Sequence, residues 1–308
     1  MINIKSGKFV GSSLFPILAA TTATCLMGST GVFVRHISMS EETIVLMRFG
    51  LGLLFLVYFL LFSDRLYEMT FANSVYPIFS GVLIALCMLF YIKAIKLTTL
   101  ASAAILLYLG PLLAAALAYV FIRERLSVVS GLLVLSACLG CILIFGINVE
   151  SDPRALRGNI FAIASAIFYA LFIITNRLTP YEISPLNRAF YQLLVGTIVL
   201  APFAEIDSQQ IVSFYSEIFW IVAMGFLQGF LSVTLMIYSI AYLKTHQYVT
   251  ISYFEPFVAS LAGIVLYDET ITIRSAFGGI IILISGVAQT LLSVRNDEDP
   301  FKSEKSHG

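Results

Sequence analysis

The sequence predicts an all-α integral membrane protein of ten transmembrane helices, arranged as two inverted five-helix repeats. Three observations predict this fold class: a very apolar composition, about ten apolar stretches of membrane-spanning length, and a segment that returns 145 residues later in the chain. Hydrophobic residues make up 59% and charged residues 12% of the 308 residues, and the mean hydropathy is +0.94. A soluble domain of this size cannot bury so much apolar surface.

The apolar stretches give the predicted spans. A helix needs about 20 mostly apolar residues to cross the hydrocarbon core of a bilayer. Ten stretches approach that length, at residues 14–34, 44–62, 75–95, 99–121, 128–147, 158–177, 187–204, 217–240, 246–266 and 275–294. With the N-terminus taken as cytoplasmic, eleven lysines and arginines fall inside and seven outside. This bias predicts that both termini are cytoplasmic. We expect the membrane to be a bacterial inner (plasma) membrane.

An internal repeat defines the domain organisation. Five positions recur at one offset: Tyr108, Pro111, Ala114, Glu124 and Ser130 return as Tyr253, Pro256, Ala259, Glu269 and Ser275. Because five spans is an odd number, the second copy enters the membrane from the opposite side, as in alternating-access carriers. We predict a first repeat over residues 1–148, a second over 149–295, and a disordered cytoplasmic tail over 296–308, which is rich in charged residues and serine.

Four motifs resemble the drug/metabolite transporter superfamily, specifically its EamA-type ten-helix branch. They are Met27-Gly28-Ser29 in the first span, the paired arginines of Met47-Arg48-Phe49 and Asn187-Arg188-Ala189, the pair Gly110-Pro111 and Glu255-Pro256, and the short hinges 123–127 and 268–272. The resemblance covers the chain to about Leu292. It implies export or exchange of small metabolites, such as amino acids or related amines, through a central cavity, driven by protons or by counter-substrate.

Glu255 is the strongest candidate for a functional residue. A carboxylate in the middle of an apolar helix is costly, and it persists only where it faces protein or water. We therefore predict Glu255 to be a proton acceptor or a counter-charge for a cationic substrate. The alternative is a hydrogen-bonded carboxylate that satisfies backbone groups freed by Pro256. Ser252 and Glu255 share one polar face of the ninth span, at helical spacing.

The other candidates come from polar stripes on neighbouring spans and from tyrosines that can surround an amine by cation–π contact. Membrane tyrosines also serve as interface anchors. The repeat relates Glu255 to Gly110. This suggests that the second half supplies polar contacts to the substrate, while small residues of the first half leave space for it. The predicted substrate-binding residues are Glu255, Tyr253, Ser252, Tyr108, Gly110, Tyr169, Asn176, Gln192, Gln228, Ser232, Tyr91 and Tyr238, with Pro111 and Pro256 as hinges.

These residues predict a secondary active transporter of a small zwitterionic or cationic metabolite, working by alternating access. The first alternative is an exchanger of nucleotide sugars or other anions, which needs several cavity-facing cations. Five candidate cations are expected near helix ends instead: Arg48, Lys93, Lys96, Arg188 and Lys244. A channel and a non-transporting membrane protein also remain open.

A membrane enzyme is less favoured than a carrier. The three histidines lie far apart in sequence, and HExxH, GxSxG and P-loop motifs are absent. We expect no cofactor and no metal. The 18 basic and 18 acidic residues cancel, so no nucleic-acid partner is expected. The expected partners are a small-molecule substrate, membrane lipid and a coupled proton or counter-substrate, with the chain a monomer or homodimer.

Overall fold

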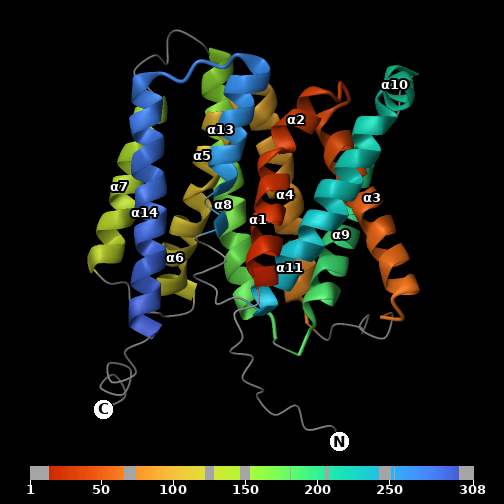
Figure 1. Ribbon diagram of the computed structural model, residues 1–308, viewed down its shortest axis with the longest axis horizontal. Helices are drawn as coiled ribbons and strands as arrows, with labels where there is room; N and C mark the ends of the chain where they lie inside the picture. Colours follow the sequence, from red (N-terminus) through yellow and green to blue (C-terminus); the bar gives the residue numbers. More distant parts are fainter. Residues whose placement is uncertain are drawn as a thin grey trace, which may run out of the picture.

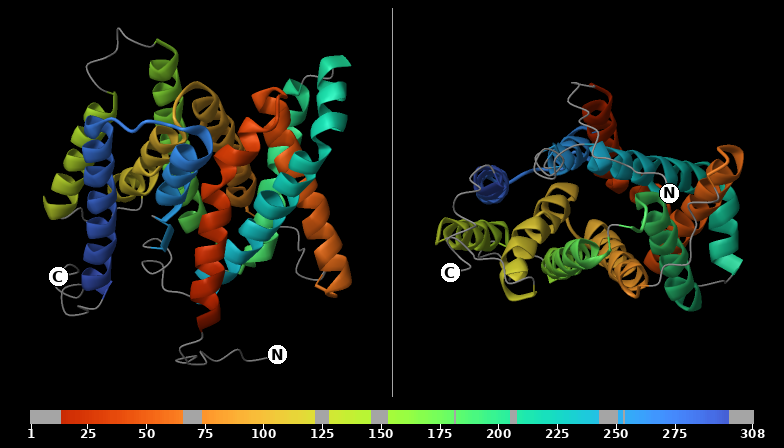
Figure 2. Two further views of the ribbon diagram at one scale, coloured as in Figure 1. Left: turned by 45° about the horizontal axis from the view of Figure 1, so that its top comes forward. Right: turned by 90° about the horizontal axis from the view of Figure 1, so that it is seen from below.

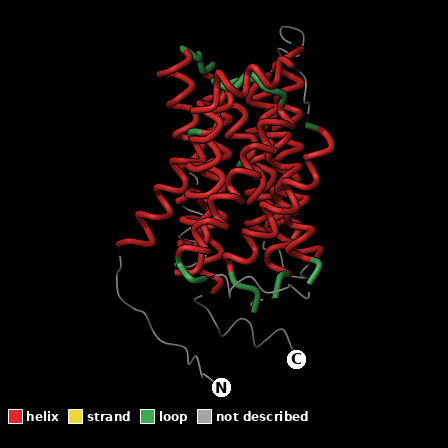
Figure 3. Tube along the Cα trace, turned by 90° about the vertical axis from the view of Figure 1, so that its right-hand side faces the viewer, coloured by secondary structure: helices red, strands yellow, loops and turns green. Residues whose placement is uncertain are grey.

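A computed structural model describes residues 14–65, 74–121, 128–145, 153–180, 182–204, 208–242, 251–252 and 254–297. These residues form helices joined by short loops, and they contain no strand (Figure 3). The helices stand side by side along a common direction (Figure 1). The predicted all-α class is confirmed.

The first half of the chain contains seven helices within its described ranges. They are α1 (Leu14–Gly28), α2 (Thr30–Arg35), α3 (Glu41–Phe62), α4 (Tyr76–Leu97), α5 (Leu100–Leu107), α6 (Leu109–Phe121) and α7 (Val128–Phe145). Two predicted spans are interrupted here. Ser29 separates α1 from α2 in the first span, and Tyr108 separates α5 from α6 in the fourth.

The second half begins with one long, uninterrupted helix. The elements of this half are α8 (Pro153–Leu178), α9 (Pro185–Leu200) with a 3₁₀ turn (Ala201–Phe203), α10 (Ser208–Met224), a π-helical segment (Gly225–Leu231), α11 (Ser232–Tyr242), α13 (Phe254–Tyr267) and α14 (Ile273–Asp297). The predicted eighth span comprises α10, the π-helical segment and α11. In addition, α14 extends two residues into the predicted tail, and residues 298–308 lie outside the described part.

Six helical stretches in the described ranges are long and apolar enough to cross a membrane. They are Phe15–Arg35, Glu41–Phe62, Tyr76–Leu97, Pro153–Asn176, Leu186–Phe203 and Ile211–Met236. Three shorter apolar helices are Leu100–Ala114, Phe254–Tyr267 and Ala276–Ala288. With the 18 residues of α7, these stretches correspond to the ten predicted crossings.

The two halves run in opposite directions. In Figure 1, α1 starts at the lower end of the bundle and α8 starts at the upper end. Contacts agree with the picture: Arg154 near the start of α8 donates to the Lys96 carbonyl at the end of α4, at 3.1 Å. The start of α1 and the end of α14 lie at the same end of the bundle (Figure 1). The predicted inverted repeat is confirmed.

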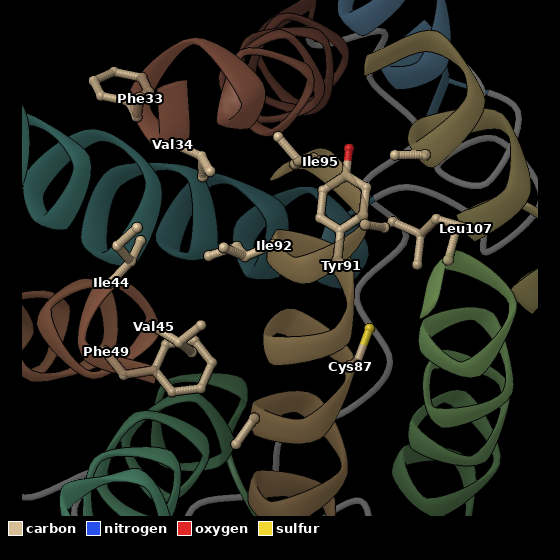
Figure 4. Close-up of a cluster of buried hydrophobic side chains, with 14 of the residues drawn as sticks. Phe33, Val34, Ile44, Val45, Phe49, Cys87, Tyr91, Ile92, Ile95 and Leu107 are labelled. Atoms are coloured by element: carbon tan, nitrogen blue, oxygen red, sulfur yellow. The ribbon is translucent and has the colours of Figure 1, made fainter. Parts of the chain in front are cut away.

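Apolar side chains are exposed on the outside of the bundle, as in a protein whose surface faces lipid. Large apolar side chains are exposed around its outside, including Phe62 at 75%, Val128 at 82% and Phe219 at 72%. Exposed apolar surface of this extent requires a nonaqueous neighbour. The interior holds a cluster of buried apolar side chains around α3 and α4, in which Tyr91 is fully buried (Figure 4).

Two close helix contacts involve Gly225 and Gly229, whose spacing predicts tight approach of a second helix. Gly225 packs against Leu51, and Gly229 packs against the Arg48 carbonyl and Gly52 of α3. A Cβ atom added at Gly229 would lie 2.9 Å from the Gly52 Cα atom. The glycine pair therefore brings the π-helical segment directly against the backbone of α3.

A Gly229→Ala substitution should destabilise the protein by about 1–3 kcal/mol, because backbone atoms cannot move aside for the new methyl group. A matched control is Gly131→Ala in α7, where an added Cβ atom meets nothing within 4 Å. That change should be neutral or stabilising by about 0.5–1 kcal/mol. Thermal unfolding of the detergent-purified variants measures both effects. Equal melting temperatures for the two variants would contradict the described contact between the π-helical segment and α3.

Candidate functional site: a cavity between the two halves

A cavity of about 100 Å³ lies inside the bundle, several times the ~10–15 Å³ that one water molecule needs. Its described walls come from both halves of the chain. They are Thr24, Met27, Arg48, Phe49, Ile84, Met88, Leu107 and Tyr108 from the first, and Tyr169, Phe172, Gln192, Leu193, Gln228, Gly229, Val233, Met236 and Glu255 from the second. A mostly apolar wall with a few convergent polar groups is typical of small-molecule sites.

Glu255 lines this cavity from the first turn of α13. Backbone N–H groups at a helix start favour a nearby negative charge. The Tyr108 hydroxyl donates a hydrogen bond to Glu255 Oε2 at 2.8 Å. This partner of Glu255 was not predicted from the sequence. The bond joins the two repeats, because Tyr108 and Glu255 lie on the fourth and ninth predicted spans.

The break at Tyr108 has a local cause in Pro111. Proline lacks an N–H donor, and its ring clashes with the carbonyl four residues earlier, which here belongs to Leu107. The helix accordingly ends at Leu107 and restarts at Leu109. The predicted hinge residue Pro111 thus lies directly after an interruption that bears a cavity tyrosine. Pro256, the other predicted hinge, is buried in the first turn of α13.

Gln228 forms hydrogen bonds to the residues around the interruption of the first span, between α1 and α2. Its Nε2 atom donates to the Leu26 carbonyl at 2.7 Å and to Ser29 Oγ at 3.2 Å. Its Oε1 atom accepts from the Thr30 hydroxyl at 2.8 Å. The side chain is fully buried in the π-helical segment. π-Helical turns are rare and are frequently found at functional sites. Gln228 therefore positions the break between α1 and α2 beside the cavity.

Arg48 lies in a different place from the one expected. The sequence analysis placed it near a helix end, but it is 2% exposed and lines the cavity. The reason is that α3 begins earlier, at Glu41. Ser40 caps this start by accepting from the Thr43 amide, and the acidic residues of the first turn pair with α4, Glu42 with Lys93 at 2.7 Å and Glu41 with Lys96 at 3.5 Å. Arg48 consequently lies about two turns inside the helix.

The repeat-related Arg188 has other contacts. It donates to three backbone carbonyls, those of Asn176 at 3.4 Å, Pro180 at 2.9 Å and Ile183 at 3.1 Å. These acceptors lie at the end of α8 and in the loop that follows it. Cations near the C-terminal end of a helix satisfy its free carbonyls. The two arginines therefore serve different purposes in this structure.

Five of the predicted substrate-binding residues line the cavity: Tyr108, Tyr169, Gln192, Gln228 and Glu255. Three others support those residues. An added Cβ atom at Gly110 would lie 3.1 Å from the Tyr169 Cβ atom, so this glycine leaves room for the tyrosine. Asn176 accepts a hydrogen bond from Gln192 at 3.2 Å, and Ser232 donates to the Gln228 carbonyl at 3.0 Å.

The remaining predicted residues fall elsewhere. Tyr91 belongs to the buried apolar cluster, where Figure 4 shows it near Ile95 and Leu107, and it is not among the described cavity residues. Ser252 is buried. Tyr253 and the Tyr238 side chain lie outside the described part. Within the described ranges, no group of three His, Cys, Asp or Glu side chains is placed to hold a metal ion.

Arg48, Thr24 and Met27 line the cavity but were not among the residues predicted for the site. Thr24 lies on the first span among small residues, Thr21, Gly28 and Gly31, and such a stripe is typical of helix packing. Packing does explain Gly28, since an added Cβ atom there would lie 2.8 Å from the Glu255 carbonyl. The signal that could have found Met27 is its position in the Met-Gly-Ser motif. The first half therefore contributes charge and polar groups as well as room.

The end of α2 and the α13–α14 loop lie at the end of the bundle opposite the chain ends (Figure 2), and they carry a second polar cluster. We call it the Glu269 cluster; it comprises Arg35, Leu100, Tyr267 and Glu269. Both Glu269 oxygens accept from the Leu100 amide at the start of α5, at 2.9 and 3.1 Å. Glu269 also pairs with Arg35, whose guanidinium lies 4.6 Å from the centre of the Tyr267 ring. The cluster ties α2 and α5 to the α13–α14 loop.

Two inverted halves of apolar helices around a shared cavity are the architecture of alternating-access membrane carriers. Comparison with known proteins identifies the group: the chain belongs to the EamA-like transporter family, whose model matches residues 14–146 and 156–290. An uncharacterized transporter of Archaeoglobus fulgidus is 27% identical over 267 residues, covering 86% of this chain and 92% of the relative. Uncharacterized transporter YxxF of Bacillus subtilis is 26% identical over 287 residues, covering 90% and 89%.

The fold is also found in a solved protein structure. A crystal structure with 20% sequence identity aligns with 91% of this chain and 98% of its own, at a TM-score of 0.58. At this identity the likeness concerns the fold alone. The chain is accordingly an integral membrane protein of a transporter family.

Proposed function

We propose that this chain is a secondary active transporter that moves a small zwitterionic or cationic metabolite by alternating access. The cavity is the cargo site, and Glu255 is the site for a cargo amine or a proton. The observation that carries this proposal is the position of Glu255, which lines a cavity enclosed by both inverted halves. An ionisable side chain inside a membrane bundle marks a substrate or ion pathway by default.

The hydrogen bond between Tyr108 and Glu255 supports a coupled role. It joins residues from the two repeats, at a helix interruption in the first half and a helix start in the second. Alternating access rocks one repeat against the other around a fixed site. Such a motion alters the surroundings of the Glu255 carboxylate, so binding at Glu255 and the position of the halves are linked.

The alternative of an anion exchanger is less well supported. A nucleotide sugar or phosphorylated cargo requires several cations, whereas Arg48 is the one cation among the described cavity residues. Glu255 balances its charge in the same space. A cavity of about 100 Å³ also suits a small metabolite better than a nucleotide sugar. With both termini cytoplasmic, as we propose, the Glu269 cluster lies on the external face.

Reconstitution into liposomes tests the proposal. Purified protein should take up a radiolabelled neutral amino acid or amine faster than protein-free liposomes do. Unlabelled cargo preloaded inside the liposomes should accelerate uptake several-fold, because a carrier with bound cargo returns its binding site to the outer face faster than an empty carrier does. A channel shows no such trans-stimulation. Uptake of a labelled nucleotide sugar in place of amino acids or amines would support the exchanger. No uptake of any cargo by correctly folded protein would refute the transporter.

A further inference from the structure

We propose that Arg48 and Thr24 form a carboxylate-binding site inside the cavity, so that the cargo is a zwitterion held between this site and Glu255. This inference rests on the proposed transport function and narrows its cargo class. Both residues line the cavity from the first half, Thr24 on α1 and Arg48 on α3. Neither was among the residues that the sequence predicted for substrate binding.

Arg48 is a buried cation without sufficient acceptors. Its Nη2 atom donates to Met27 Sδ at 3.1 Å, and a thioether is only a weak acceptor. Its Nη1 atom is buried and has no hydrogen-bond partner among the described residues. A buried guanidinium without an anion carries a large desolvation penalty. The free nitrogen is therefore suited to an anion that enters the cavity.

Glu255 does not supply that anion by direct contact. The charges of Arg48 and Glu255 attract each other across the cavity, but the two side chains form no ion pair within the described structure. One Glu255 oxygen is already bonded to Tyr108. The cavity thus presents a positive group and a negative group that remain separate. A molecule with an acid and an amine can satisfy both at once.

Thr24 adds a second free donor. Its hydroxyl is buried and has no partner among the described residues, and Thr24 is 3% exposed. Thr24 and Met27 are three residues apart on α1, so they share a helix face. Since Met27 contacts Arg48, the Thr24 hydroxyl lies on the same cavity-facing side of α1. A hydroxyl and a guanidinium together match the two oxygens of one carboxylate.

The remaining cavity residues indicate the size and polarity of the cargo's side chain. The cavity is lined chiefly by apolar side chains, among them Phe49, Ile84, Leu107 and Phe172. Phosphate would bring more charge than a single guanidinium balances. A compact apolar amino acid fits the combination of one cation, one anion and an apolar wall.

Binding of matched ligand triads to the detergent-purified full chain tests this site. Each of alanine, valine, leucine and phenylalanine is compared with its decarboxylated amine and its deaminated acid. We expect the wild-type protein to bind at least one of these zwitterions ten-fold or more tightly than the matching amine. Arg48→Gln should reduce zwitterion binding to the level of the amine and leave amine binding within two-fold. Thr24→Val should weaken zwitterion binding several-fold.

Two further variants separate binding from folding. Arg48→Lys keeps the charge and should retain part of the preference for the zwitterion. Arg188→Gln removes the repeat-related arginine, which binds backbone carbonyls, and should leave the zwitterion-to-amine ratio unchanged even if stability falls. The inference is overturned if the wild-type protein prefers an amine, if it binds none of the four zwitterions, or if Arg48→Gln keeps the wild-type ratio. Carboxylate-independent uptake in liposomes would overturn this site while leaving the transporter intact.

Discussion

Replacing Glu255 by glutamine should weaken binding of amine-bearing cargo by an order of magnitude or more and remove its pH dependence. Glutamine keeps the size of the side chain and can still accept from Tyr108, but it carries no charge. A hydrogen bond to a charged group contributes about 1.5–3 kcal/mol, which corresponds to roughly ten- to a hundred-fold in affinity. Equilibrium binding of labelled cargo between pH 5 and pH 8 measures the effect.

The direction of the pH effect follows from competition for one carboxylate. A proton and a cargo ammonium group cannot both occupy the Glu255 anion, so wild-type affinity should fall as the medium becomes more acidic. The glutamine variant should show a flat profile at its lower affinity. Tyr108→Phe is the matched control, because it removes the 2.8 Å hydrogen bond and keeps the acid. It should lose only a few-fold in affinity and keep the pH dependence. A wild-type pH profile in Glu255→Gln would rule out the assigned role.

The fold could be predicted from the sequence because a bilayer imposes one strong constraint. Each crossing needs a long apolar helix whose backbone bonds are satisfied internally, so hydropathy locates the spans. The offset that relates Tyr108 and Pro111 to Tyr253 and Pro256 then indicates a duplicated, inverted chain. The Glu255 position in the cavity follows from the cost of a charge among apolar residues. These inferences depend on local sequence and on symmetry alone.

The parts that could not be predicted depend on contacts between distant helices. The first turn of α3 is held against α4 by ion pairs from Glu41 and Glu42 to Lys93 and Lys96, and the packing of the assembled helices places Arg48 in the cavity. The predicted eighth span begins at residue 217, whereas α10 begins nine residues earlier, at Ser208. In the structure the Glu217 carboxylate accepts from the Ser38 amide at 2.8 Å, and the helix continues on both sides.

The places of the interior residues could not be predicted from the sequence for the same reason. Helical spacing alone does not distinguish Tyr91, which packs in the apolar cluster, from Tyr108 and Tyr169, which line the cavity. The π-helical segment at Gly225–Leu231 accompanies the contact of Gly229 with the α3 backbone, some 180 residues earlier in the chain. Such features depend on which faces meet after the helices assemble.

Glu269→Gln should open the end of the bundle that carries the Glu269 cluster. We expect access to the cavity from that end to need separation of α2, α5 and the α13–α14 loop, which would break the bonds of Glu269 to Arg35 and to the Leu100 amide. The Glu269 carboxylate is 7% exposed and the Arg35 side chain 27%, so the bonds to the buried Leu100 amide are better shielded from water than the ion pair is. Losing about 2 kcal/mol from the closed state shifts the ratio of open to closed molecules by roughly thirty-fold.

Cysteine labelling measures that shift. Met27→Cys, in a background without the four native cysteines, places a thiol in the cavity wall. Its reaction with a membrane-impermeant maleimide added at the Glu269 face should accelerate more than ten-fold when Glu269→Gln is introduced. Glu217→Gln is the control, because this carboxylate lies at the same end and binds only Ser38 among the described residues. If both substitutions accelerate labelling equally, or neither does, the Glu269 cluster does not close the cavity. Labelling by maleimide added at the opposite face should slow at the same time. The reason is that a larger fraction of molecules open to the Glu269 face leaves a smaller fraction open to the opposite face.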